Sequence, residues 1–171
     1  MMPDAIVKAL LDGSVSVEEA LSENDEHAFN TPDHDYDPAW DYRVIARPHP
    51  RVMHHVGIVV PKLVETAREI GMGRPTVHYV RGLGRGAVAK YAHGTAPHPV
   101  LLIDPHHYRK LDDGHMHWAV HTSLFHEFGH AIEDWMGHGD KPDEEGVEDY
   151  ARDTFDRGHL SATHDFMKRF K

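Results

Sequence analysis

The sequence has no cysteine among its 171 residues. This absence excludes disulfide bonds, thiolate metal sites and cysteine nucleophiles together. Long apolar runs are also missing, because the longest, at residues 56–60 and 100–103, are far too short to span a bilayer. The N-terminus, Met-Met-Pro-Asp-Ala-Ile, lacks the basic and apolar regions of a secretory signal. We therefore expect a cytoplasmic protein with no membrane partner.

Positive charge is scarce as well. The chain has 18 Lys and Arg residues against 28 Asp and Glu residues, and its formal net charge is −10. Such a chain repels the backbone of nucleic acids, so we expect no nucleic-acid partner. The glycine-rich stretch at residues 82–86 lacks the Lys-Ser/Thr pair of a phosphate loop and is followed by strand-like sequence. We therefore interpret it as a turn.

Length and composition predict one α+β domain preceded by an arm. A chain of 171 residues fits a single domain, and a hydrophobic content of 40% is enough for a core. Residues 1–48 are expected to form a helical and irregular arm, since residues 24–50 are rich in Asp, His, Pro and Asn and show little periodicity. Residues 49–171 are expected to form the folded domain.

Periodicity within that domain predicts helices on both sides of three short strands. A helix is expected over residues 51–72, with Pro61 either kinking it or opening a second helix and with Gly71 near its end. Strand-like runs follow at residues 76–80, 88–92 and 100–103. A strongly apolar helix is expected from about residue 115 to 136, then a helix over 143–155 and a short helix or tail from Gly158.

The apolar helix carries the motif His126-Glu127-Phe128-Gly129-His130. Histidines four residues apart project from one face of a helix and can share a tetrahedral zinc ion. Glu127 points to the side of that face, where it can act as the general base for a metal-bound water. Gly129 leaves room for another segment to approach. Shuffling this composition produces the motif in roughly one chain in ten, but its uncharged flanking residues favour a metal site over chance.

A catalytic zinc site needs a third protein ligand and one open position. The next helix, with the sequence DEEGVEDYARDTF, offers Glu145 as that ligand. Asp149, one turn later, can accept the free N–H of a ligating histidine. Five other residues remain alternatives for the third ligand: Glu148, the less favoured Glu144, His138, His159 and His164.

Over residues 52–156 the chain resembles the zincin peptidases of the gluzincin branch, in which the His-Glu-x-x-His helix is followed by a Glu-x-x-x-Asp helix. The resemblance implies a zincin-like metallopeptidase fold for residues 49–171, with a small mixed sheet packed on an active-site helix and a backing helix. It also implies a Zn²⁺ ion held by His126, His130 and Glu145, and peptide-bond hydrolysis with Glu127 as general base.

The same resemblance implies where the substrate binds. A protein or peptide would add as a further strand to the sheet edge at residues 87–93, with the strand at 100–103 beside it. Gluzincins steady the oxyanion of the reaction with a His or Tyr, and Tyr150 is one candidate for a catalytic residue of this kind. His117, His159 and His164 are the other candidates, and the arm could place Asp33 or Asp35 on the zinc as a removable ligand.

Small size and the absence of a signal make the chain most similar to the ImmA/IrrE-like cytoplasmic peptidases, through Glu145-x-x-x-Asp149-Tyr150-Ala151. A SprT-like protease, with a histidine as third ligand, is a second comparison. Two functions without hydrolysis also remain open. One is a catalytically inactive zinc-binding interaction module, and the other is a histidine-rich metal buffer, since the chain has 18 histidines.

Overall fold

The computed structural model describes residues 43–44, 49–81, 83 and 88–170. The predicted arm, with Asp33 and Asp35, and most of the glycine-rich turn lie outside these residues. The described part is a mixed α+β structure, as the sequence predicted. Its elements in chain order are β1 (Arg43–Val44), α3 (Pro50–Ile70), β2 (Thr76–Arg81), β3 (Ala89–Tyr91), β4 (Val100–Ile103), η2 (Pro105–Tyr108), α4 (Asp113–Trp135), α5 (Glu144–Asp156), α6 (His159–Met167) and η3 (Lys168–Phe170).

The strands form a small mixed sheet in the order β1-β2-β4-β3. β2 and β4 are parallel, while β3 pairs antiparallel with β4 and β1 antiparallel with β2. All four residues of β4 are buried, as expected for an apolar strand with neighbours on both sides. Among the described strands β3 lies at an edge, next to β4, which is the position predicted for it.

Helix α3 passes through Pro61 without interruption. The alternative in which Pro61 opens a second helix is therefore wrong. Pro61 is exposed, and Pro50 occupies the first turn, where a missing N–H costs nothing. The helix ends at Gly71, whose φ of 80° is left-handed and whose N–H bonds back to the last turn, as the sequence predicted.

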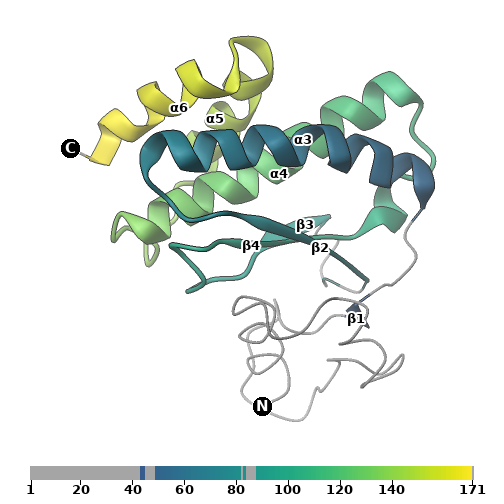
Figure 1. Cartoon of the computed structure of the whole chain (residues 1–171), viewed down its shortest axis with the longest axis horizontal. Helices are drawn as coiled ribbons and strands as arrows, with labels where there is room; N and C mark the ends of the chain where they lie inside the picture. The colour runs from purple at the N-terminus through teal and green to yellow at the C-terminus, as the bar shows by residue number, and fades with distance from the viewer. Residues whose placement is uncertain (1–42, 45–48, 82, 84–87, 171) are drawn as a thin grey trace.

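Helices α3 and α4 lie side by side over one face of the sheet (Figure 1). On its sheet side α4 buries Val120 and Leu124 near Leu101 and Ile103 of β4.

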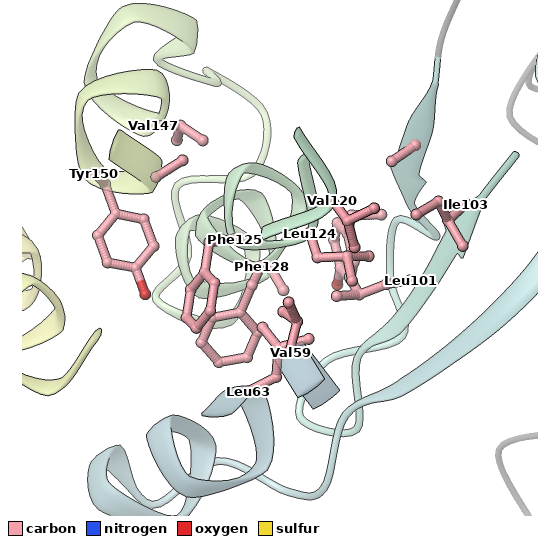
Figure 2. Packing of buried hydrophobic residues seen from close by; sticks show 14 of the residues in the cluster. Val59, Leu63, Leu101, Ile103, Val120, Leu124, Phe125, Phe128, Val147 and Tyr150 are labelled. Carbon is pink, nitrogen blue, oxygen red and sulfur yellow. The ribbon is translucent and has the colours of Figure 1, made fainter. Parts of the chain in front are cut away.

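Another side of α4 packs on the neighbouring helices. It buries Phe125 and Phe128, which reach Val59 and Leu63 of α3 (Figure 2). Tyr150 of α5 lies beyond Phe125. A helix that is apolar on several sides belongs inside the domain. The rigid position of α4 follows from this packing.

Within the described residues, no helix is both long and apolar enough to cross a membrane.

Two buried histidines make the fold sensitive to acid. The side chain of His121, on α4, faces α5, and its Nε2 is 2.9 Å from Thr154 Oγ1. Burial lowers the pKa of His121 to about 3. Burial also lowers the pKa of His78, on β2, to about 4. Both side chains are therefore neutral in the folded state, whereas in the unfolded chain each takes up a proton below about pH 6.5. The free energy of unfolding must fall as the pH drops below this value.

We predict a loss of up to about 2 kcal/mol per buried histidine between pH 7 and pH 5. Urea unfolding followed by circular dichroism at several pH values measures it. His121→Phe keeps a ring against Phe125 but removes the titrating group, so it should flatten this pH dependence. His54→Gln, at an exposed position, should leave it unchanged. Equal pH dependence in the parent and His121→Phe would contradict the prediction.

Candidate metal centre and cleft

A cleft of about 700 Å³ opens beside α4, and the motif residues His126, Glu127 and His130 all line it. Helix α4 forms one side and the edge strand β3 another, while the α4–α5 connection and the first turns of α5 complete the wall. The remaining lining residues are Val88, Ala89, Lys90, Tyr91, His93, Trp118, Ala119, Thr122, Ser123, Glu133, Gly139, Pro142, Glu144 and Glu148. The predicted edge strand and the predicted histidine motif therefore share one cavity.

The two motif histidines converge on a single carboxylate. His126 Nε2 is 3.1 Å from Glu144 Oε2, and His130 Nε2 is 3.1 Å from Glu144 Oε1. The imidazole ring centroids are 4.9 Å apart. One ligand atom from each of the three residues lies within 4.8 Å of the others. Two imidazole nitrogens and a carboxylate oxygen at this spacing could hold a metal ion.

The opposite ring nitrogens are each held by another carboxylate. His126 Nδ1 is 2.7 Å from Glu148 Oε2, and His130 Nδ1 is 2.7 Å from Glu133 Oε1. A carboxylate accepts a hydrogen bond from the Nδ1–H of an imidazole, which leaves the lone pair on Nε2. Both histidines thus direct Nε2 lone pairs to the same point beside Glu144, as ligating histidines in metal sites do.

Glu133 connects the centre to the start of α5. Its side chain is only 3% exposed, and its second oxygen, Oε2, accepts a 2.9 Å hydrogen bond from Asp143 N. Asp143 caps α5 by accepting from Gly146 N at 2.9 Å, and it pairs with Arg169 of η3. A continuous set of polar contacts therefore runs from the C-terminal turn to the ring of His130.

Gly129 allows α5 to approach α4 closely. A Cβ atom at this position would lie 2.9 Å from Val147 Cγ1 and 3.1 Å from Tyr150 Cδ2. Such contacts are too short for carbon atoms, which pack at about 3.5–4.0 Å. The expectation that Gly129 admits another segment is confirmed, and that segment is the helix that carries Glu144 and Glu148.

The structure brings Glu144, not Glu145, to the two histidines. Positions 144, 147, 148 and 151 recur at helical spacing and share the face of α5 that packs on α4, since Val147 and Ala151 are buried there. Glu145 and Asp149 each lie one residue, or about 100°, away from this face. Exposure does not distinguish Glu145 from Glu144, since both are exposed and the Glu144 side chain is 69% exposed. The structure therefore places Glu144 where the sequence predicted Glu145, and Glu148 makes the histidine contact that was predicted for Asp149.

Tyr150 does not reach the cleft. Its hydroxyl lies 2.8 Å from Thr163 Oγ1 and its ring stacks on Phe166 at 4.4 Å, in the core beneath Gly129. The structure therefore places Tyr150 away from the cleft and does not support the role predicted for it. The four alternative histidines do not line the cleft that the described residues form. His159 pairs with Glu65 and His164 with Glu69. His138 packs against Phe170, and His117 packs against Phe155.

Glu127 lies in the same cleft with one oxygen fixed. Its Oε2 accepts a 2.8 Å hydrogen bond from Tyr91 N of the edge strand. Burial raises the pKa of this carboxyl group, although the neighbouring His130 and His126 oppose the shift. Burial alone would lower the pKa of His130, but Glu127, Glu133 and Glu144 together raise it. A carboxylate with a raised pKa binds protons more readily, as a general base requires.

Asp134 fixes the edge strand against α4. It accepts hydrogen bonds from Tyr91 Oη at 2.6 Å and from Gly94 N at 2.9 Å. Neither Asp134 nor Glu133 was predicted from the sequence to belong to the candidate site. Their spacing could have predicted this position, because they follow His130 by four and three residues, and residues at these distances are neighbours on a helix.

Comparisons with protein-family models, with curated proteins and with solved structures found no match to this chain.

Glu133→Gln tests whether the buried carboxylate orients His130. His130 Nδ1–H and Asp143 N–H each bond to a different oxygen of Glu133, and glutamine replaces one of these acceptors with an NH₂ donor. Removing such an outer partner of a ligand typically costs 10–100-fold in metal affinity, and we predict a loss of this size, measured by competition with a chromophoric chelator. Glu145→Gln makes the same charge change beside the centre and should bind metal normally. Equal affinity in both variants would rule out the orienting role.

Proposed function

We propose that this protein is a zinc-dependent peptidase of the gluzincin type, with a zincin-like fold. One observation carries the proposal: His126 Nε2 and His130 Nε2 meet at the carboxylate of Glu144, while Glu127 lies beside them in the same cleft. Two histidines, a carboxylate ligand and an adjacent carboxylate base are the groups that hydrolysis by this route requires.

The donor set suits zinc better than a harder cation. Two imidazole nitrogens and one carboxylate oxygen are a common ligand set of catalytic zinc sites, which keep one further position open. Magnesium and calcium prefer oxygen ligands throughout. The carboxylates of Glu133 and Glu148 on the two Nδ1 atoms supply the outer contacts that zinc-binding histidines ordinarily make.

Zinc, when bound, supplies Lewis acidity that makes a water molecule acidic near neutral pH and polarises a carbonyl group. Glu127 then takes a proton from the attacking water. Since Tyr91 N–H engages its Oε2, its Oε1 is the oxygen left to accept that proton. The same carboxyl group passes the proton to the leaving amine, so that no charged amide anion has to leave.

The edge strand β3 provides a place for an extended peptide. Val88 O accepts from Asp104 N at 2.9 Å, and Ala92 N donates to Val100 O at 2.9 Å, so residues 88, 90 and 92 pair with the inner strand. By the alternation of antiparallel pairing, the main-chain groups of Ala89 and Tyr91 point away from it. Tyr91 N–H already donates to Glu127, so a peptide added here would form its main-chain hydrogen bonds with the remaining outward groups, whatever its sequence.

Metal analysis of single variants tests the ligand set. We predict one zinc ion per chain by mass spectrometry of the purified, untagged protein. His130→Ala and Glu144→Ala should lose it or bind it far more weakly, since each removes a ligand, whereas Glu145→Ala should keep it. Loss of zinc in Glu145→Ala with retention in Glu144→Ala would contradict the assignment. No zinc in the parent after reconstitution would overturn the proposed function.

Glu127→Gln separates a peptidase from a metal-binding interaction module. The variant keeps the shape of the side chain but cannot take up a proton. Hydrolysis of a casein or peptide-pool substrate should fall about 10²–10⁴-fold, with zinc content unchanged. An equally active variant would exclude Glu127 as the base. If the zinc-loaded parent cleaves nothing in the pool and both proteins capture the same peptides, the chain is an interaction module.

A further inference from the structure

Tyr91, the last residue of β3, contacts α4 at two points that lie seven residues apart. Its main-chain N–H donates to Glu127 Oε2 at 2.8 Å, and its hydroxyl donates to Asp134 Oδ2 at 2.6 Å. Residues seven apart lie on one face of a helix, two turns and about 10 Å from each other along its axis. Tyr91 thus fixes the edge strand to the helix of the histidine motif on both sides of His130.

The Tyr91 hydroxyl is fully engaged in this attachment. Its single proton goes to Asp134, and the hydroxyl oxygen accepts a 3.0 Å hydrogen bond from Ala96 N. Gly94 N donates to the same Asp134 oxygen at 2.9 Å. Burial, together with the hydrogen bond to Asp134, raises the pKa of Tyr91 well above its usual value, so the hydroxyl stays a donor. Although Tyr91 lines the cleft, its hydroxyl has no proton left to offer a substrate.

The position of β3 depends on this attachment. The strand has only three residues, and among the described strands it pairs with β4 alone. A short edge strand with few main-chain hydrogen bonds is more easily displaced than an inner strand. The hydrogen bond between Tyr91 and Asp134 therefore adds a fixed point at the end of the strand that carries the N–H bonded to Glu127.

The orientation of Glu127 depends in turn on that N–H. A glutamate side chain turns about several single bonds, and the hydrogen bond from Tyr91 N–H to Oε2 selects the orientation that leaves Oε1 for the attacking water. Hydrogen bonds weaken steeply when the donor turns away from the acceptor. Misplacing a reacting group by about 1 Å can cost about 10²-fold in rate. A small displacement of Tyr91 would therefore affect the proposed base.

On the basis of the proposed function, we infer that Tyr91 and Asp134 are positioning residues for the base: their side-chain hydrogen bond holds Tyr91 N–H on Glu127 and so sets the direction of the free carboxylate oxygen. Neither side chain acts on the reacting atoms or moves a proton in this role. Their loss should lower kcat more than it raises KM, because the metal ligands and the strand itself remain in place.

Steady-state kinetics of full-length, zinc-loaded variants on a peptide that the parent cleaves test the inference. Tyr91→Phe removes only the hydroxyl, and kcat should fall about 10-fold with KM changed by less than about 3-fold. Asp134→Ala should show the same loss, whereas Asp134→Asn keeps an oxygen that can accept from both Tyr91 and Gly94 and should retain most of the activity. Tyr79→Phe removes a hydroxyl from β2, a strand outside the cleft lining that the described residues form, and should keep the parental kcat.

An NMR measurement on the same proteins detects the positioning itself. The amide proton of residue 91 is bonded to Glu127 in the parent, so Tyr91→Phe and Asp134→Ala should move its resonance upfield and speed its exchange with solvent about 10-fold. The amide of Ala92, which donates to Val100 O, should change little. A general structural role of the hydroxyl would instead affect both amides alike.

The outcomes are distinguishable. An unchanged kcat in Tyr91→Phe, a loss in Asp134→Asn as large as in Asp134→Ala, or equal changes at both amides would each overturn the inference while leaving the peptidase in place. A zinc-loaded parent that cleaves no peptide would overturn the proposed function, and the inference with it. Zinc content and the free energy of unfolding are measured for every variant, so that a lost metal ion or a misfolded protein cannot be mistaken for a misplaced base.

Discussion

The close contact between α4 and α5 at Gly129 is the constraint on which the site depends. Because a side chain there would collide with Val147 and Tyr150, only glycine lets α5 lie near enough for its carboxylates to reach the histidines of α4. Glu144 and Glu148 sit on the same face of α5 as the buried Val147. Core packing and the geometry of the candidate metal centre therefore depend on the same contact, and a shift of α5 would change both.

The centre also connects parts of the chain that are distant in sequence. Glu133 holds His130 and the first turn of α5, and Tyr91 holds Glu127 and, through Asp134, the end of α4. The proposed base, Glu127, and the strand proposed to bind substrate are thus joined by one hydrogen bond. The proposed catalysis would need its reacting groups to be held on rigid elements in this way.

Local patterns in the sequence predicted much of this arrangement. Helical spacing placed His126 and His130 on one face, and short apolar runs between turns placed β3 beside β4. The choice of Glu144 over Glu145 could not be made in this way, because both carboxylates lie in the first turn of α5 and only its rotation against α4 separates them. The position of Tyr150 could not be predicted for a related reason: the buried face of α5 turns its hydroxyl towards Thr163, a partner on another helix that no local pattern reveals.

The most direct test of the central claim is a crystal structure of the zinc-loaded protein with anomalous data collected on both sides of the zinc absorption edge. We predict one strong anomalous peak within bonding distance, about 2.0–2.2 Å, of His126 Nε2, His130 Nε2 and a carboxylate oxygen of Glu144. Nδ1 of His126 should still bond to Glu148, and Nδ1 of His130 to Glu133. A peak at other residues, or no peak in the cleft of a protein shown to contain zinc, would contradict it.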